Sequence, residues 1–169
     1  TSPYGIQKRI ADTYVRQYNV LYDLDTVALR YFNVYGPGQT GSQYAGVIDV
    51  FSNQAENGGP ITVEGDGGQT RDFIHVYDIV RANLCAATTD ATGEAYNVGT
   101  GNSITIRGLA EMMQKQSATD PEIIHQEARQ GDIRKSRADV RKAQSKLEFE
   151  PTITLETGLQ EFTESDETR

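Results

Sequence analysis

Strand-like and helix-like segments alternate along the whole of this 169-residue chain. Short runs rich in β-branched and aromatic residues are predicted to be strands, and they cover residues 25–36, 61–65, 73–76, 95–101 and 122–125. Segments with apolar residues at helical spacing are predicted to be helices, and they cover residues 2–14, 44–57, 77–88, 106–116, 138–147 and 154–164. No repeat or low-complexity linker divides the chain, so the order predicts one mixed α/β arrangement.

The chain is acidic, with 24 Asp and Glu residues against 16 Lys and Arg residues and a formal net charge of -8. Such a surface repels polyanions, so no nucleic-acid partner and no anionic membrane partner is expected, and an anionic ligand must be met by local arginines. No apolar run is long enough for a membrane span, and no leader-like segment begins the chain. The single cysteine, Cys85, cannot form an internal disulfide, which favours a reducing, cytoplasmic setting.

The first helix carries a tyrosine and a lysine four positions apart. Ser2 is a suitable N-cap and Pro3 suits the first turn, so Tyr4 and Lys8 are predicted to project from one helix face. A phenol beside an ammonium group is suited to proton transfer, although the same pair also occurs on ordinary solvated helix faces. The apolar residues of this helix recur at a spacing that predicts a buried stripe: Ile6, Ile10 and Tyr14.

Five sequence blocks occur in an order that points to a known family. The blocks are SPYGIQK, LRYFNVYGPGQ, GDGGQTRDFIHVYDIVRA, YNVGTG, and RQGDIRKSRADVRKA followed by LEFEP. Together they resemble the extended short-chain dehydrogenase/reductase family, in its nucleotide-sugar epimerase and dehydratase branch, which includes UDP-glucose 4-epimerases. The resemblance implies an α/β fold: the C-terminal part of a Rossmann-type parallel sheet plus a smaller mixed α/β substrate-binding domain.

The family's glycine-rich cofactor turn does not occur in these residues, since neither GxGxxG nor GxxGxxG is present. Because the chain also begins with Thr, it is expected to be the C-terminal portion of a longer enzyme, without the N-terminal cofactor cradle. The resemblance places the last Rossmann elements near residues 1–35 and 72–100. It places the interleaved nucleotide-sugar-binding domain near residues 36–71 and 101–169.

The resemblance also implies the chemistry, with NAD as the cofactor. Tyr4 matches the catalytic tyrosine and Lys8 its partner, and both would lie beside the cofactor together with Tyr31. The phenolate would take a proton from a sugar hydroxyl while hydride leaves the same carbon for the nicotinamide, which gives a keto sugar. Because a free phenol loses its proton only near pH ~10, Lys8 and the positive nicotinamide ring would both have to stabilise the phenolate.

Six further residues are assigned to the nucleotide-diphosphate sugar by resemblance: Asn33, Gly46, Val47, Arg71, Arg129 and Asp132. Arg71 and Arg129 would clamp the diphosphate, because a guanidinium fork matches phosphate oxygens. Asn33 and the backbone amides at the start of the second helix would assist, and Asp132 would accept from ribose hydroxyls. For each arginine, a surface ion pair with a neighbouring aspartate, Asp72 or Asp132, is the alternative.

The remaining candidate residues are given structural roles. His75 and His125 are predicted to be structural histidines, and Met112 and Met113 to be core residues. The chain has no HxxxH or CxxC pair, so no metal site is expected.

The sequence is compatible with three functions. The leading one is NAD-dependent epimerisation of a nucleotide-diphosphate sugar of the UDP-glucose 4-epimerase type, with a homodimer expected for the full-length enzyme. The second is a sugar-nucleotide 4,6-dehydratase or decarboxylase of the same family. The third is a noncatalytic nucleotide-sugar-binding piece, and the 169 residues alone are expected to be inactive because the cofactor cradle is missing.

Overall fold

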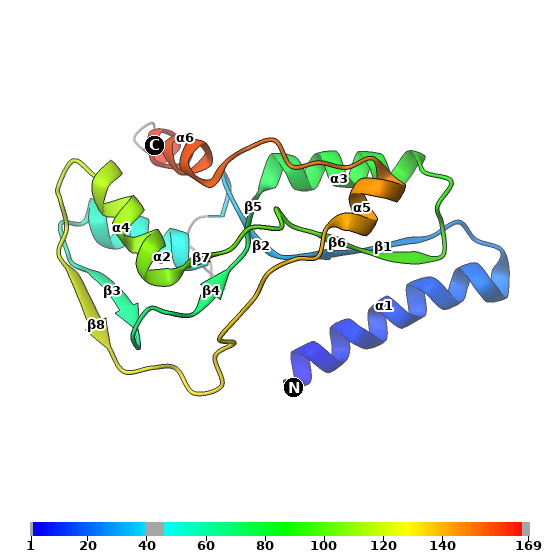
Figure 1. Cartoon of the computed structure of the whole chain (residues 1–169), viewed down its shortest axis with the longest axis horizontal. Coiled ribbons are helices and arrows are strands. Elements are labelled where there is room, and N and C mark those ends of the chain that lie inside the picture. Colours follow the sequence, from blue (N-terminus) through cyan, green and yellow to red (C-terminus); the bar gives the residue numbers. More distant parts are fainter. Residues whose placement is uncertain (1, 40–45, 167–169) are drawn as a thin grey trace.

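The structure, a computed structural model, describes residues 2–39 and 46–166 (Figure 1). The helices of this part are α1 (Pro3–Tyr22), α2 (Val47–Glu56), α3 (Val76–Thr88), α4 (Ile106–Gln116), α5 (Arg141–Leu147) and α6 (Leu155–Asp166). The strands are β1 (Val27–Tyr31), β2 (Asn33–Tyr35), β3 (Ile61–Glu64), β4 (Thr70–Arg71), β5 (Phe73–His75), β6 (Glu94–Val98), β7 (Ile104–Thr105) and β8 (Ile123–Gln126).

Three of the strand pairs are parallel. They are β1 with β6, β2 with β5, and β3 with β8, and each pair joins strands that are distant in the sequence. The fourth pair, β4 with β7, is antiparallel and only two residues long on each side. The mixed α/β prediction is therefore confirmed. The sequence missed β4 and β7, because a two-residue strand is too short to show alternation.

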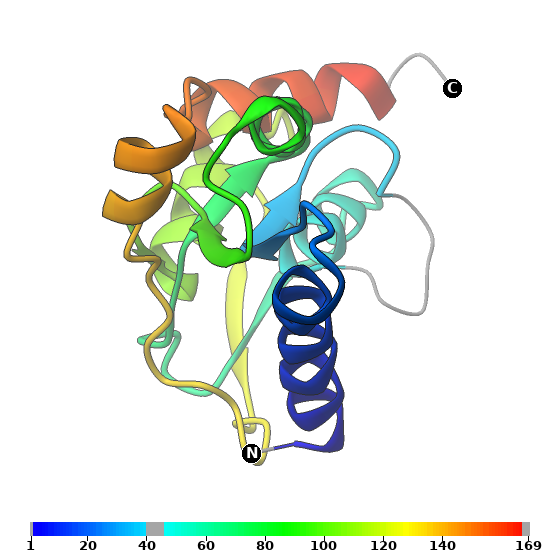
Figure 2. The same cartoon turned by 90° about the vertical axis from the view of Figure 1, so that its right-hand side faces the viewer.

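Two buried clusters divide the molecule into two lobes. In the first lobe, α1 covers one face of the β1–β6 pair while α3 and α5 cover the other (Figures 1 and 2). Its core consists of Ile74, Ile79, Ala82, Tyr96, Val98, Ala143, Leu147 and Phe149. The second lobe, called here the cavity lobe, contains β3, β8, β4, β7, α2, α4 and α6. Its core consists of Tyr35, Ile48, Phe51, Ile61, Val63, Phe73, Ile106, Leu109, Ala110, Met113 and Leu159.

Strands β2 and β5 join the two lobes. Because successive side chains of a strand point to opposite faces, Phe73 packs in the cavity lobe while its neighbour Ile74 packs in the first lobe. The predicted domain division stays a prediction. Helix α5, which lies within the 101–169 range assigned to substrate binding, packs in the core of the first lobe.

Helix α1 begins as the sequence predicts. The Ser2 hydroxyl accepts a hydrogen bond from the Gly5 amide at 3.1 Å, and Pro3 occupies the first turn. The prediction of a buried stripe is wrong: Ile6, Ile10 and Tyr14 are 49%, 50% and 63% exposed. A stripe is buried only where another element covers it. In the described residues, α1 lies against the β1–β6 pair, and its half-buried residues are polar: Asp12, Arg16 and Asn19.

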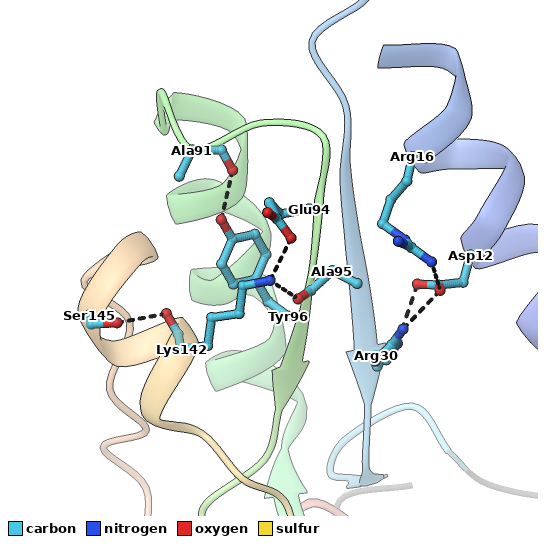
Figure 3. A network of polar contacts seen from close by, with 9 residues as sticks. All are labelled: Asp12, Arg16, Arg30, Ala91, Glu94, Ala95, Tyr96, Lys142 and Ser145. Atoms are coloured by element: carbon cyan, nitrogen blue, oxygen red, sulfur yellow. Dashed lines mark hydrogen bonds and ion pairs between the residues drawn. The ribbon is translucent and has the colours of Figure 1, made fainter. Parts of the chain in front are cut away.

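Charged groups attach α1 to the strand beneath it. The Asp12 carboxylate accepts from Arg30 of β1 at 2.8 and 3.3 Å and from Arg16 at 3.1 Å (Figure 3). On the other side of the strand pair, Lys142 of α5 lies over the Tyr96 ring at 4.7 Å and pairs with Glu94 at 2.7 Å. No helix in the described residues has the length and apolar character needed to cross a membrane.

Candidate functional site

A cavity of about 390 Å³ opens in the cavity lobe. Its walls come from β2, α2, β3, β4, α4, β8 and the connection that follows β8. Five of the residues predicted to bind substrate line it: Asn33, Val47, Arg71, Arg129 and Asp132. These residues span 100 positions of the sequence, from 33 to 132, and the parallel pairing of distant strands is what brings them together.

Asn33 is fixed at the start of β2. Its backbone amide and its side-chain Nδ2 both donate to the Asp72 carbonyl, each at 3.0 Å. The strand pairing sets Asn33 opposite Phe73 at the start of β5. The side chain is thus held at a strand junction on the cavity wall, with the second hydrogen of its amide available to a ligand.

The carboxylate of Asp72 fastens three segments together. It is fully buried, and it accepts from Thr100 N and Oγ1 at 2.9 and 2.7 Å and from the amides of Gly101 and Ala138 at 3.0 Å each. The fit is tight, since a Cβ on Gly99 would lie 2.6 Å from the Ala138 Cβ. The sequence indicated Asp72 only as a possible ion-pair partner. A buried carboxylate that satisfies backbone amides leaves no periodic signal in a single sequence.

Arg71 uses most of its hydrogen-bond donors within the protein. Nη1 donates to the carbonyls of Thr70 and Ile133 at 2.8 and 2.5 Å, and Nη2 donates to the Asp132 carboxylate. The side chain is only 16% exposed. These contacts use three of the five N–H donors of a guanidinium and tie β4 to the connection after β8. The ion-pair alternative for Arg71 is therefore present in the structure.

Arg129 is held more loosely than Arg71. Its Nη2 lies 3.1 Å from Oε1 of Glu64, and its side chain is 73% exposed. Farther along the same connection, Arg134 makes a two-pronged pair with Asp66 at 2.7 and 2.8 Å. Glu64 belongs to none of the residues predicted to bind substrate, although the alternation of β3 contained the signal. Ile61 and Val63 are fully buried, so Thr62 and Glu64 must face the other side, toward the cavity.

Gly46 and Val47 begin helix α2. Gly46 is the N-cap residue, and Val47 lines the cavity. The first amides of a helix have no partners within the helix, so this end of α2 offers N–H donors to an anion. Part of the predicted helix 44–57, namely residues 44 and 45, lies outside the described residues.

Tyr4 and Lys8 lie together, as predicted, with Lys8 Nζ 5.5 Å from the centre of the Tyr4 ring. Tyr4 is 67% exposed. Neither residue is part of the cavity wall. The N-terminal end of α1 lies on the same side of the molecule as the connection after β8, as Figures 1 and 2 both show.

Tyr31 lies apart from these residues. Its hydroxyl donates to Oδ1 of Asn83 in α3 at 3.0 Å, so the ring faces α3, on the opposite side of β1 from α1. The structure thus brings five predicted residues together around the cavity, places Gly46 next to them, and leaves Tyr4, Lys8 and Tyr31 on the first lobe.

The histidines have structural contacts. His75 is fully buried and caps α3, with Nδ1 accepting from the Tyr77 amide at 3.3 Å, and burial lowers the pKa of its imidazole. His125 Nδ1 lies 2.8 Å from the Gly65 carbonyl oxygen. Met113 is buried and Met112 packs against the same core, as predicted. Within residues 2–39 and 46–166, no group of three or more His, Cys, Asp or Glu side chains is arranged to hold a metal ion.

Comparisons with known proteins agree with these observations. A match to the NAD dependent epimerase/dehydratase family covers residues 1–99. The UDP-glucose 4-epimerase of Mycolicibacterium smegmatis is 35% identical over 158 residues, which are 94% of this chain and 50% of that protein. The UDP-N-acetyl-alpha-D-glucosaminuronate decarboxylase of Bacillus cytotoxicus is 32% identical over 164 residues, covering 94% of this chain and 51% of that protein.

A solved structure extends the agreement to three dimensions. The UDP-glucose 4-epimerase of the hyperthermophilic Thermotoga maritima, with UDP-glucose, matches with a TM-score of 0.95 at 38% identity, covering 99% of this chain and 54% of that chain. The chain spans about half the length of the curated relatives it matches. The resemblance and the fold class predicted from the sequence are both confirmed, and the chain belongs to the NAD-dependent epimerase/dehydratase family.

Proposed function

We propose that this protein takes part in the NAD-dependent epimerisation of a nucleotide-diphosphate sugar, in the manner of a UDP-glucose 4-epimerase. The observation that carries the proposal is the cavity of about 390 Å³, where Asn33, Arg129 and Asp132 converge beside the N-terminus of α2. Amide, guanidinium and helix N–H donors suit a diphosphate, and a carboxylate suits ribose hydroxyls. This arrangement explains how a chain with a net charge of -8 could hold an anion.

Tyr4 is the proposed base, since Lys8 Nζ lies 5.5 Å from its ring centre. The phenolate takes the proton of the sugar hydroxyl as a carbonyl forms at that carbon. When the keto sugar is reduced from its other face, Tyr4 returns the proton to the new hydroxyl. Bound NAD supplies the chemistry of accepting and returning hydride, so no net oxidation results.

The proposal assigns a different role to each lobe. The first lobe would serve the cofactor and the reacting carbon through Tyr4 and Lys8, and the cavity lobe would hold the nucleotide. The assignment of Tyr31 to the cofactor rests on the resemblance alone, because its ring lies on the other side of β1 from α1. A homodimer and a cytoplasmic location complete the proposal. The first rests on the resemblance, and the second on the single cysteine.

Epimerisation is preferred because the relatives from M. smegmatis and T. maritima are both named UDP-glucose 4-epimerases. The B. cytotoxicus relative is named a decarboxylase, so decarboxylation or dehydration on the same Tyr–Lys pair is the second candidate. The third candidate is a noncatalytic nucleotide-sugar-binding role, in which the cavity holds the nucleotide and Tyr4 takes part in no turnover.

The test incubates the native protein with UDP-glucose and NAD and follows UDP-galactose by chromatography. The expected outcome is interconversion of the two sugars without accumulation of NADH. Release of carbon dioxide from UDP-glucuronate would instead select the decarboxylase, and loss of water from a nucleotide-glucose would select the dehydratase. Binding of UDP without any turnover of these sugars would select the noncatalytic role.

A further inference from the structure

The charges that line the cavity cancel. Two arginines, Arg71 and Arg129, face it together with two carboxylates, Glu64 and Asp132. Arg71 pairs with Asp132, and Arg129 pairs with Glu64. Among the residues that the structure describes, the cavity wall therefore has no excess of positive charge to offer a diphosphate. To use the charge of an arginine, the ligand has to draw that arginine away from its carboxylate partner.

The two pairs differ in how firmly they are held. Arg71 is fixed by two backbone carbonyls as well as by Asp132 and is only 16% exposed. Arg129 is 73% exposed and meets Glu64 through one contact of 3.1 Å. An exposed, single-contact pair contributes little to stability and exchanges partners readily. Of the two arginines, Arg129 therefore gives up the weaker contacts when it turns from its carboxylate to a bound anion.

Glu64, in contrast, has its backbone fixed in the cavity wall. It is the last residue of β3, where Ile61 and Val63 are fully buried on the opposite face. Its backbone is held as well, since Gln69 Nε2 donates to the Glu64 carbonyl at 3.0 Å. When Arg129 turns to a ligand, the carboxylate of Glu64 stays beside the same cavity. In the described part of the chain, Arg129 is the cation that pairs with Glu64, so the carboxylate is then left unpaired beside a second anion.

We propose that Glu64 competes with the diphosphate for Arg129 and so sets how tightly the cavity holds its nucleotide. The inference rests on the proposed function, because it assigns the diphosphate to this cavity. Glu64 limits the affinity in two ways. Its carboxylate pairs with Arg129 before a ligand binds, and it repels the anion that takes its place beside Arg129. A neutral side chain at position 64 would release Arg129 and remove the repulsion.

The experiment measures binding of three probes, UDP, uridine and inorganic pyrophosphate, to the native protein by calorimetry. Four proteins are compared with wild type: Glu64→Gln, Arg129→Ala, the double variant, and Glu127→Gln. The Gln substitution at position 64 keeps the shape of the side chain. Glu127 is an exposed carboxylate two residues from Arg129, so Glu127→Gln makes the same change in net charge and is the matched control.

Glu64→Gln is expected to tighten UDP and pyrophosphate by about three- to tenfold, the scale of one exposed ion pair plus a nearby repulsion. Uridine, which has no phosphate, should bind as before. In the Arg129→Ala background the gain should shrink, because the competition for that arginine is gone and only the direct repulsion by the Glu64 carboxylate remains. Glu127→Gln should leave all three affinities unchanged.

Other results would overturn the inference in distinct ways. Unchanged or weaker UDP binding in Glu64→Gln would show that Glu64 does not compete, and weaker binding would make it a ligand contact instead. An equal gain with and without Arg129, or the same gain in Glu127→Gln, would reduce the effect to general charge repulsion. If wild type binds UDP no better than uridine, the cavity does not hold a diphosphate, and the proposed function fails together with the inference.

Discussion

Helices α1 and α4 both carry regularly spaced apolar residues, yet only α4 has a buried face. In α4, Ile106, Leu109 and Met113 are at most 5% exposed and pack in the core of the cavity lobe. Helix α1 is nearly twice as long, at 20 residues against 11, and none of its residues is buried. Its attachment to β1 is polar instead, through Asp12 and Arg30.

Apolar residues at helical spacing therefore predict an amphipathic helix, but they do not indicate which element, if any, covers its apolar face. It also separates two properties of the molecule. The proposed catalytic residues, Tyr4 and Lys8, lie on α1, which has no buried residue in the described part of the chain. The proposed binding cavity lies in the cavity lobe, which has its own core. Substitutions in the two regions should therefore change different measured quantities.

The largest expected effect is on turnover. Tyr4→Phe in the native protein removes the proposed proton acceptor and keeps the ring, so turnover should fall by about 10²- to 10⁴-fold. UDP affinity should stay within about twofold of wild type, because Tyr4 is not part of the cavity wall. Steady-state kinetics and calorimetry measure the two quantities separately. A variant that keeps wild-type turnover would remove Tyr4 from the mechanism.

The next effect is on folding stability and tests the two helices directly. Leu109→Ala should lower the free energy of unfolding by about 2 to 5 kcal/mol, because Leu109 is fully buried in α4. Ile10→Ala, at a position that is 50% exposed in α1, should change it by less than about 0.5 kcal/mol. Urea unfolding of the native protein measures both. A loss above about 2 kcal/mol for Ile10→Ala would show that another segment or a second copy covers α1.

Much of the fold was predictable because its elements carry local signals. The run 25–36 became β1 and β2, and the segment 106–116 became α4 with the same bounds. The cavity was predictable only through the resemblance, since Asn33 and Asp132 are almost 100 positions apart and no spacing rule links them.

Two features could not be read from the sequence for a physical reason. Burial of α1 depends on which neighbour covers it, and local spacing cannot reveal that. The role of Asp72 depends on amides of Thr100, Gly101 and Ala138, and backbone donors are the same whatever the sequence. Long-range pairing of a side chain with the backbone is therefore invisible until the chain is folded.

Within the cavity lobe, the two arginines should differ. Arg129→Ala should weaken UDP binding by about tenfold, because one exposed charged contact is lost. Arg71→Ala should weaken it at least as much and also lower stability by about 1 to 3 kcal/mol, because the carbonyls of Thr70 and Ile133 lose their donor. Arg71→Lys should restore only part of the binding, since an ammonium cannot reproduce the guanidinium fork. Calorimetry and urea unfolding of each variant decide the matter, and equal stability of the two Ala variants would contradict the anchoring role of Arg71.

The smallest expected effect concerns the polar attachment of α1, and it depends on pH. The hydrogen bond from Arg30 lowers the pKa of the Asp12 carboxyl below its ordinary value, and the charges of Arg30 and Arg16 act in the same direction. Because the folded-state pKa is depressed, the contribution is present above the unfolded-state value near 4 and is lost as the pH falls through the folded-state value. Asp12→Asn should therefore lower the free energy of unfolding by about 0.5 to 1 kcal/mol at pH 7, and the difference from wild type should close on acidification below about pH 4.

Other carboxylates titrate equally in both proteins, so the difference isolates Asp12, and Glu150→Gln at an exposed position serves as the control. A gap that persists unchanged at pH 3 would mean that Asp12 holds α1 through its shape and neutral hydrogen bonds instead of its charge.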